Sequence, residues 1–156
     1  MTDIEAQLAV QGLLARYVRA IDDDRLEEWP ELFAERCLYK VTTAENHAQN
    51  LPAGIIYCNS KGMLLDRVQS LRRANIYEPQ RYRHLVSAIQ IVRREGTIAE
   101  VESDFLVVRT MENGNTLLFA TGRYLDRIVL GPQPLFEQKI VVCDSTRTDT
   151  LLAIPL

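Results

Sequence analysis

Four side chains could carry general acid–base chemistry if the fold gathers them around one cavity. They are Tyr17, Asp22, Tyr57 and His84. A carboxylate and an imidazole beside an apolar pocket can move a proton in a dehydration or an isomerisation. The simpler interpretation makes Asp22 a solvated residue at a helix end and His84 a hydrogen-bonding residue at a strand start. An open pocket that both side chains face would favour catalysis.

The side chains suited to binding a metal are few and lie far apart in the sequence. The two histidines are His47 and His84, and the three cysteines, Cys37, Cys58 and Cys143, form no CxxC pair. A Rieske cluster needs paired Cys and His ligands, and mononuclear iron needs two histidines and a carboxylate. We therefore expect no intrinsic iron or zinc. Each cysteine lies in or beside an apolar run, which favours buried free thiols.

Charge and hydropathy argue against two further classes of protein, those that bind nucleic acid and those that span a membrane. The net charge is −3, whereas proteins that bind nucleic acid carry a basic face. No phosphate-binding GxxxxGK[ST] or GxGxxG motif occurs, no apolar run reaches the length of a membrane span, and no signal peptide opens the chain. We expect a cytoplasmic protein without nucleic-acid or membrane partners.

Four arginines cluster in the middle of the sequence. They are Arg72, Arg73, Arg81 and Arg83, and Glu78 lies among them. Because acidic residues are interleaved, an ion-pair network or a protein interface is favoured over a track for phosphates.

The elements that must position these residues begin with helices. Thr2 and Glu5 have the spacing of a capping box, and Asp24 with Glu27 repeats it before a second helix that Pro30 keeps short. The predicted buried stripe of the first helix comprises Ile4, Leu8, Leu13 or Leu14, Tyr17 and Ile21. Residues 37–43 are then predicted to form a strand, residues 44–54 a loop, and residues 54–58 a short extended segment.

The second part of the chain is predicted to form one helix and then the strands of a sheet. Ser60 can cap a helix whose apolar positions are Met63, Leu64, Val68 and Leu71. Strands are predicted over residues 84–92, 98–110, 116–129 and 135–144, joined by hairpin turns, with a bulge or kink at Gly122. Helices followed by a long antiparallel meander predict one α+β domain over residues 1–156, with helices on the concave face.

The last seven residues, 150–156, are unusually apolar. Leu151, Leu152, Ile154 and Leu156 follow a polar turn. Such a segment packs either on its own domain or into a partner, and burial in a partner is slightly favoured because four long strands already cover the core.

Three groups of residues, in this order and spacing, are typical of one protein family. They are Tyr17, Asp22, Trp29, Phe33 and Tyr39, then Arg81-Tyr82-Arg83-His84, and then Phe105 and Arg109 with Gly122-Arg123-Tyr124 and Asp126. With them, the chain resembles over nearly its full length the small (beta) subunits of Rieske-type aromatic-ring-hydroxylating dioxygenases. Segments 75–78, 81–84 and 143–151 are most similar to the small subunits that serve terephthalate, with salicylate hydroxylases as neighbours.

The resemblance implies a cystatin-like (NTF2-like) cone that associates with itself as a trimer within a complex of three large and three small subunits. It places the Rieske 2Fe-2S cluster and the mononuclear Fe(II) on the large (alpha) subunit, and it implies dihydroxylation of an aromatic carboxylate such as terephthalate. It carries no catalytic residue onto this chain. Arg81, Arg83 and His84 are assigned to a subunit junction or to strand-end hydrogen bonds, and the apolar tail to the interface. A stand-alone dehydratase or isomerase using Asp22, Tyr17 and His84 remains the alternative.

Overall fold

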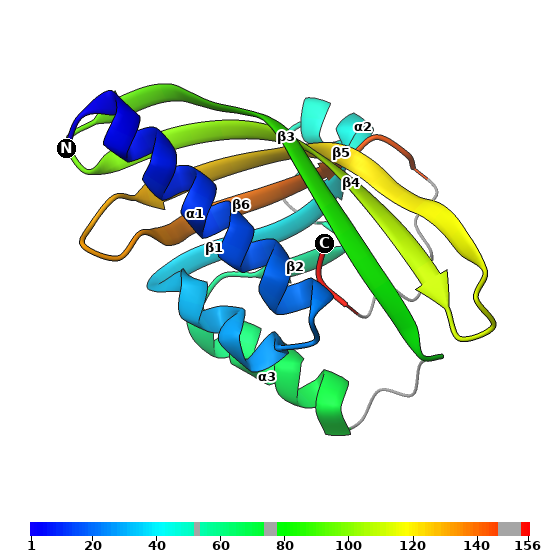
Figure 1. Ribbon diagram of the computed structural model, residues 1–156. Coiled ribbons are helices and arrows are strands. Elements are labelled where there is room, and N and C mark those ends of the chain that lie inside the picture. Colours follow the sequence, from blue (N-terminus) through cyan, green and yellow to red (C-terminus); the bar gives the residue numbers. More distant parts are fainter. Residues whose placement is uncertain (52–53, 74–77, 147–153) are drawn as a thin grey trace.

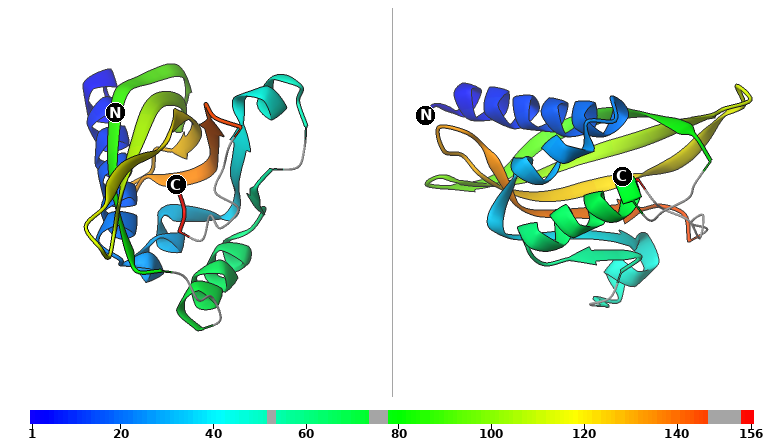
Figure 2. Two further views of the ribbon diagram at one scale, coloured as in Figure 1. Left: turned by 90° about the vertical axis from the view of Figure 1, so that its right-hand side faces the viewer. Right: turned by 90° about the horizontal axis from the view of Figure 1, so that it is seen from below.

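The fold joins an N-terminal helical segment to one curved sheet (Figure 1). A computed structural model describes residues 1–51, 54–73, 78–146 and 154–156. The six strands of this part of the chain lie in the order β2-β1-β6-β5-β4-β3. Seen end-on, the sheet is curved, with α1 along one side of it and α3 at the bottom (Figure 2, left). This arrangement confirms the α+β prediction.

Helix α1 (Asp3–Asp22) begins at the predicted capping box. The Thr2 side chain accepts a hydrogen bond from the Glu5 main chain, and the Glu5 carboxylate accepts one from the Thr2 main chain. The predicted buried stripe is partly wrong, because Ile4 and Leu8 are 74% and 62% exposed. The sheet covers a face shifted around the helix axis, and that face consists of Ala6, Val10, Leu13, Leu14, Tyr17, Ala20 and Ile21.

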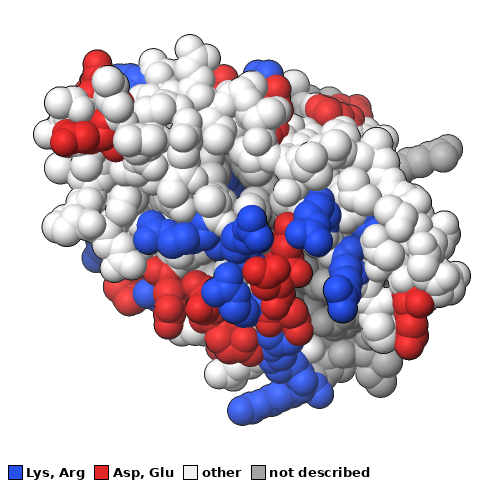
Figure 3. All heavy atoms as spheres, viewed as in Figure 1, with Lys and Arg blue, Asp and Glu red and all other residues white. Residues whose placement is uncertain are grey.

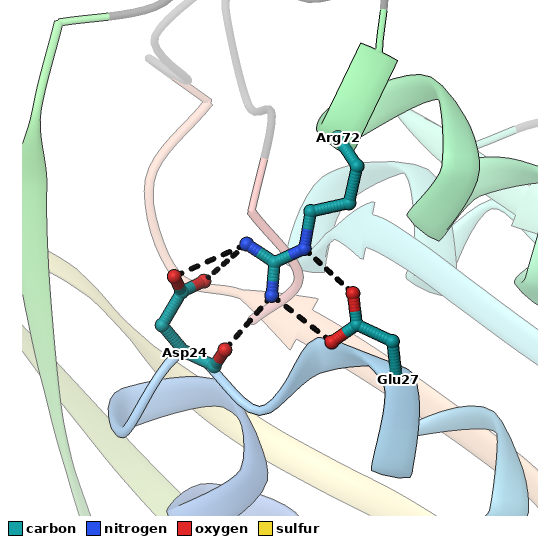
Figure 4. Close-up of polar contacts among 3 residues, drawn as sticks. All are labelled: Asp24, Glu27 and Arg72. Atoms are coloured by element: carbon teal, nitrogen blue, oxygen red, sulfur yellow. Dashed lines mark hydrogen bonds and ion pairs between the residues drawn. The ribbon is translucent and has the colours of Figure 1, made fainter.

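The turn after α1 is held by an arginine from a distant helix. Asp24 has a left-handed backbone (φ 56°), and the 3-10 helices η1 (Leu26–Glu28) and η2 (Pro30–Leu32) follow it. Arg72 Nη1 donates to both carboxylate oxygens of Asp24, at 2.9 and 3.1 Å, and Arg72 Nε donates to Glu27 at 2.7 Å (Figure 4). The predicted capping box of Asp24 and Glu27 is therefore wrong, because both carboxylates bind Arg72 on α3 (Lys61–Arg73).

The first strands pair in a way that hairpin signals could not predict. Strand β1 (Phe33–Thr43) runs parallel to β6 (Leu135–Cys143) and antiparallel to the short β2 (Ile56–Cys58). The predicted loop after β1 contains a helix, α2 (Ala44–Ala48), capped by the Thr43 hydroxyl. The predicted cap of α3 is confirmed, since Ser60 Oγ accepts the Met63 N–H at 3.2 Å.

The predicted antiparallel meander is confirmed. It consists of β3 (Gln80–Glu95), β4 (Ile98–Met111), β5 (Thr116–Val129) and β6. Gly96 and Gly114 occupy the hairpin turns with φ of 59° and 85°, which glycine adopts without a steric penalty.

Of the predicted bulge or kink at Gly122, the bulge is wrong. Gly122 pairs in register with Phe105, whereas the register of β4 and β5 shifts at Val107/Val108, which leaves Phe119 as the extra residue. A Cβ atom on Gly122 would lie 1.9 Å from the Val142 carbonyl oxygen. Glycine is therefore required here by the close approach of β6, not by a bulge.

The end of the described chain lies inside the sheet, not on its surface. Ile154 is 8% exposed and Leu156 is 1% exposed (Figure 2). The Leu156 N–H donates to Tyr39 Oη at 3.1 Å, and the hydroxyls of Tyr17 and Tyr39 donate to the Leu156 main-chain oxygen. The expectation that a partner buries this tail is wrong for Ile154 and Leu156, because the chain's own core already covers them. Leu151 and Leu152 lie outside the described residues.

Candidate functional site

A cleft opens where the end of α1 faces the start of β3. Its volume is about 860 Å³. Three successive aspartates, Asp22, Asp23 and Asp24, lie on its α1 side, and Arg81 and Arg83 lie on its β3 side. Acidic and basic side chains stand next to each other in the centre of this face of the molecule (Figure 3). The cleft is further lined by Ile21, Leu71, Pro79, Gln80, Tyr82 and Ile154.

Asp22 and His84 meet beside this cleft, as the acid–base hypothesis requires. Asp22 Oδ1 lies 2.6 Å from His84 Nδ1, and Asp22 Oδ2 accepts the His84 main-chain N–H at 2.8 Å. The side chains are 6% and 0% exposed. Strand β3 is the last strand of the sheet, so its outer N–H groups have no neighbouring strand to bind. Asp22 satisfies one of them and fixes the imidazole at the same time.

The other two residues of the acid–base hypothesis lie elsewhere. Tyr17 donates its hydroxyl proton to the main-chain oxygen of Leu156 inside the core, and Tyr57 is 47% exposed on β2. Both oxygens of Asp22 are already hydrogen-bonded to His84. The arrangement can therefore anchor a strand, but it does not bring the predicted carboxylate, phenol and imidazole together around one cavity.

A buried ion pair, absent from the expectations above, lies at the centre of the core. Lys139 Nζ donates to both carboxylate oxygens of Asp126, at 3.1 and 3.0 Å, and both side chains are 0% exposed. The ammonium also lies 3.6 Å from the ring centroid of Tyr124, within the range of a cation–π interaction. Burial lowers the pKa of Lys139 and raises that of Asp126, and each charge opposes part of the other's shift.

The alternation of inward and outward side chains along β5 and β6 could have predicted that both residues of this pair are buried. Asp126 shares the inward face of β5 with Tyr124 and Ile128, and Lys139 shares that of β6 with Val141. A charge at an inward position predicts a buried partner of opposite sign. The partner's identity depends on the register Asp126↔Lys139, which the pattern of either strand alone does not specify.

The residues suited to a metal do not assemble into a site. Within the described ranges, no three side chains among His, Cys, Asp and Glu come close enough to hold a metal ion. Cys37, Cys58 and Cys143 are buried free thiols, and burial raises the pKa of all three, to about 11 for Cys143.

The predicted interface residues divide into two groups. Arg81 and Arg83 are exposed along β3, and no described carboxylate pairs with either. His84 is buried behind Asp22, which agrees with its assignment to a strand hydrogen bond. No described helix combines the length and the apolar character that crossing a membrane requires.

Comparison with known proteins extends over almost the whole chain. A sequence model of the family described as "Ring hydroxylating beta subunit" matches residues 16–146. The subunit beta 1 of the terminal oxygenase component of terephthalate 1,2-dioxygenase from Comamonas sp is 42% identical over 151 residues, covering 96% of this chain and 98% of that protein. The anthranilate 1,2-dioxygenase small subunit from Burkholderia cepacia is 43% identical over 156 residues, covering 99% and 96%.

A solved structure gives the same result in three dimensions. A protein from Novosphingobium aromaticivorans, described as the beta subunit of an aromatic-ring-hydroxylating dioxygenase, superposes with a TM-score of 0.89. It is 41% identical in sequence, and the match covers 97% of each chain.

Proposed function

The chain belongs to the family of ring-hydroxylating dioxygenase beta subunits, and from this membership we propose that it serves a Rieske oxygenase whose substrate is an aromatic carboxylate. The observation that carries the proposal is the identity of 42–43% to two small subunits over nearly the full chain. Terephthalate and anthranilate, the acids in the names of those relatives, share a carboxylate on an aromatic ring. Terephthalate is the first substrate to test.

In this proposal the chain has a structural role and the large subunit holds the Rieske cluster and the mononuclear iron. The support comes from what fills the inside of the curved sheet. The Lys139–Asp126 pair, its surrounding aromatic rings and the Leu156 side chain occupy that space. This interior offers packing to the domain rather than a set of iron ligands. We further propose a complex of three large and three small subunits.

The test is to produce the chain together with the Rieske-type large subunit from the same genome. We expect the two to copurify, with a mass that fits equal numbers of each subunit. With a matching reductase, oxygen uptake should depend on an aromatic carboxylate, and terephthalate, anthranilate and salicylate should be compared. Failure to copurify contradicts the role of the chain, whereas uptake with salicylate alone contradicts only the preferred substrate.

One observation favours a second candidate function, the stand-alone dehydratase or isomerase. It is the 2.6 Å contact between Asp22 and His84 beside a cleft. This candidate requires catalytic turnover by the purified chain without a large subunit, and that turnover should disappear in His84→Ala. Turnover by the purified chain that is unchanged in His84→Ala, or no dehydratase or isomerase turnover at all, would eliminate it.

A further inference from the structure

A second hollow opens between the last turns of α1, the 3-10 helices that follow it, and the turn from β5 to β6, which contributes Gln133. Its volume is about 360 Å³, within the range of about 300–1,000 Å³ that is typical of small-molecule sites. The apolar part of its lining consists of Ala15, Ala20 and Leu32, of which the last two are buried. We name this hollow the α1–η2 pocket.

Three arginines line the α1–η2 pocket, and two of them have no counter-charge. Arg25 Nη1 binds the Glu28 carboxylate at 2.8 Å. Among the described residues, no ion pair or side-chain hydrogen bond engages the guanidinium of Arg16 or Arg19. Residues three positions apart lie side by side on a helix, so these two like charges repel each other. An anion between them would relieve the repulsion and accept hydrogen bonds from both forks of donors.

The charges of the lining decide which anion fits. Three arginines and two glutamates line the pocket, so its net charge is +1. Arg25 and Glu28 cancel each other, and Glu31, which pairs with no described cation, offsets one of the two remaining arginines. A single carboxylate neutralises this lining. A phosphate group carries nearly two negative charges, so it would leave an excess of negative charge beside Glu31.

The apolar lining favours a ring as the rest of the ligand. Ala15 and Ala20 are one turn and a quarter apart on α1, and their small side chains leave room for a flat group against the helix. Leu32 adds apolar surface from η2. Pockets for small molecules combine such apolar walls with a few polar groups that fix the orientation. The short stem of an Asp or Glu side chain from another protein would leave these walls uncovered.

We propose that the α1–η2 pocket binds an aromatic monocarboxylate, with Arg16 and Arg19 holding the carboxylate and the apolar lining holding the ring. The choice of an aromatic acid rests on the proposed function, because that is the class of substrate the oxygenase would act on. Binding joins α1 to η2, so it stabilises the folded chain in proportion to the logarithm of the ligand concentration once the site is saturated.

Titration of the isolated full chain with benzoate tests the pocket, because the large subunit and its substrate are then absent. Amide NMR signals of residues 15–20 and 28–32 should shift and saturate, and the melting temperature should rise. Benzamide keeps the ring without the charge, inorganic phosphate keeps a charge without the ring, and neither should shift these signals at equal concentration. No shift with benzoate, or equal shifts with either control ligand, overturns the proposal.

Variants test the two parts of the pocket separately. Arg16→Gln and Arg19→Gln should each weaken benzoate binding about tenfold, since each removes charge-assisted hydrogen bonds. Arg36→Gln, at an exposed position of β1, should not. Ala15→Leu fills the pocket while keeping its arginines, so it should block binding, whereas Gln11→Leu, one turn earlier on α1 and outside the pocket, should not. Equal binding by Ala15→Leu and the unaltered chain overturns the proposal.

The pocket and the proposed function can fail separately. Oxygen uptake by the complex with an aromatic carboxylate, together with no benzoate binding to the isolated chain, refutes the pocket alone. A chain that binds benzoate through Arg16 and Arg19 but does not copurify with the large subunit refutes the proposed function and leaves the pocket standing.

Discussion

Asp22 holds His84 by two groups at once, the imidazole ring at 2.6 Å and the main-chain N–H at 2.8 Å. The contact joins the last residue of α1 to the outermost strand of the sheet. It fixes where the helix ends relative to β3, and it protects one exposed hydrogen-bonding group of an edge strand. A carboxylate used in this way is a structural residue of the fold.

Asp22→Asn should therefore lower stability. The amide keeps one acceptor but loses the charge that strengthens both hydrogen bonds, so we expect a loss of about 1–3 kcal/mol in the free energy of unfolding by urea. Asp23→Asn, which alters an exposed neighbour, should change it by less than about 0.5 kcal/mol. Turnover of the reconstituted oxygenase should be equal in both variants. Dehydratase or isomerase turnover by the purified chain that is lost in Asp22→Asn, with stability retained, would restore the acid–base hypothesis.

Local patterns predicted the parts of the fold that depend on neighbours in sequence. The Thr2 capping box, the Ser60 cap and the strand over 116–129 are confirmed because each depends on residues a few positions apart. The parallel pairing of β1 with β6 depends on chain segments about a hundred residues apart. No turn signal reports such a contact, and the same is true of Arg72 binding Asp24.

At the candidate site, too, the sequence predicted the types of residue but not how their side chains are arranged. The types of Asp22 and His84 were recognisable as reactive, and their proximity is real. What the sequence could not predict is that both Asp22 oxygens are used by one residue, and that Tyr17 binds the main chain of Leu156 instead. Orientation depends on packing, which side-chain type and spacing do not determine.

Gly122 should be intolerant of any side chain. A Cβ atom there would lie 1.9 Å from the Val142 carbonyl oxygen and 2.9 Å from the Phe105 ring, so β6 would have to move. We expect Gly122→Ala to cost at least about 3 kcal/mol or to prevent folding. Gly12→Ala is the control, because its Cβ meets nothing within 4 Å in the middle of α1. That change should stabilise by about 0.5–1 kcal/mol. Equal melting temperatures of the two variants would refute the close-approach argument.

The Lys139–Asp126 pair should be strongly coupled. Lys139→Met leaves a carboxylate buried without its counter-charge, so we expect a loss of about 3–5 kcal/mol. Adding Asp126→Val should recover most of that loss, since two apolar side chains require no pairing. Urea unfolding of both single variants and the double variant measures the coupling. Additive losses would mean that the two charges contribute independently.

Stability should decrease in alkaline solution partly because of Cys143. Burial raises the pKa of this thiol from 9.0 to about 11 in the folded chain. Between these values the unfolded chain releases the proton and the folded chain keeps it, so the favourable contribution present below pH 9 is lost as the pH rises toward 11. The free energy of unfolding should fall by about 2 kcal/mol more in the unaltered chain than in Cys143→Ala over this range. Parallel pH profiles of the two proteins would exclude the thiol as a cause.

Leu156 should matter for folding more than for assembly, the reverse of what its apolar sequence context predicted. Its side chain is 1% exposed, and its main chain is hydrogen-bonded to Tyr17 and Tyr39, so it belongs to the core of this domain. Leu156→Ala should cost about 2–4 kcal/mol in the free energy of unfolding of the isolated chain. Leu65→Ala, on an exposed position of α3, should cost less than about 0.5 kcal/mol. At a temperature where Leu156→Ala remains folded, its affinity for the large subunit should match that of the unaltered chain, since a side chain already covered by its own domain has no surface to give to a partner. Unchanged melting with weakened assembly would return this residue to the subunit interface.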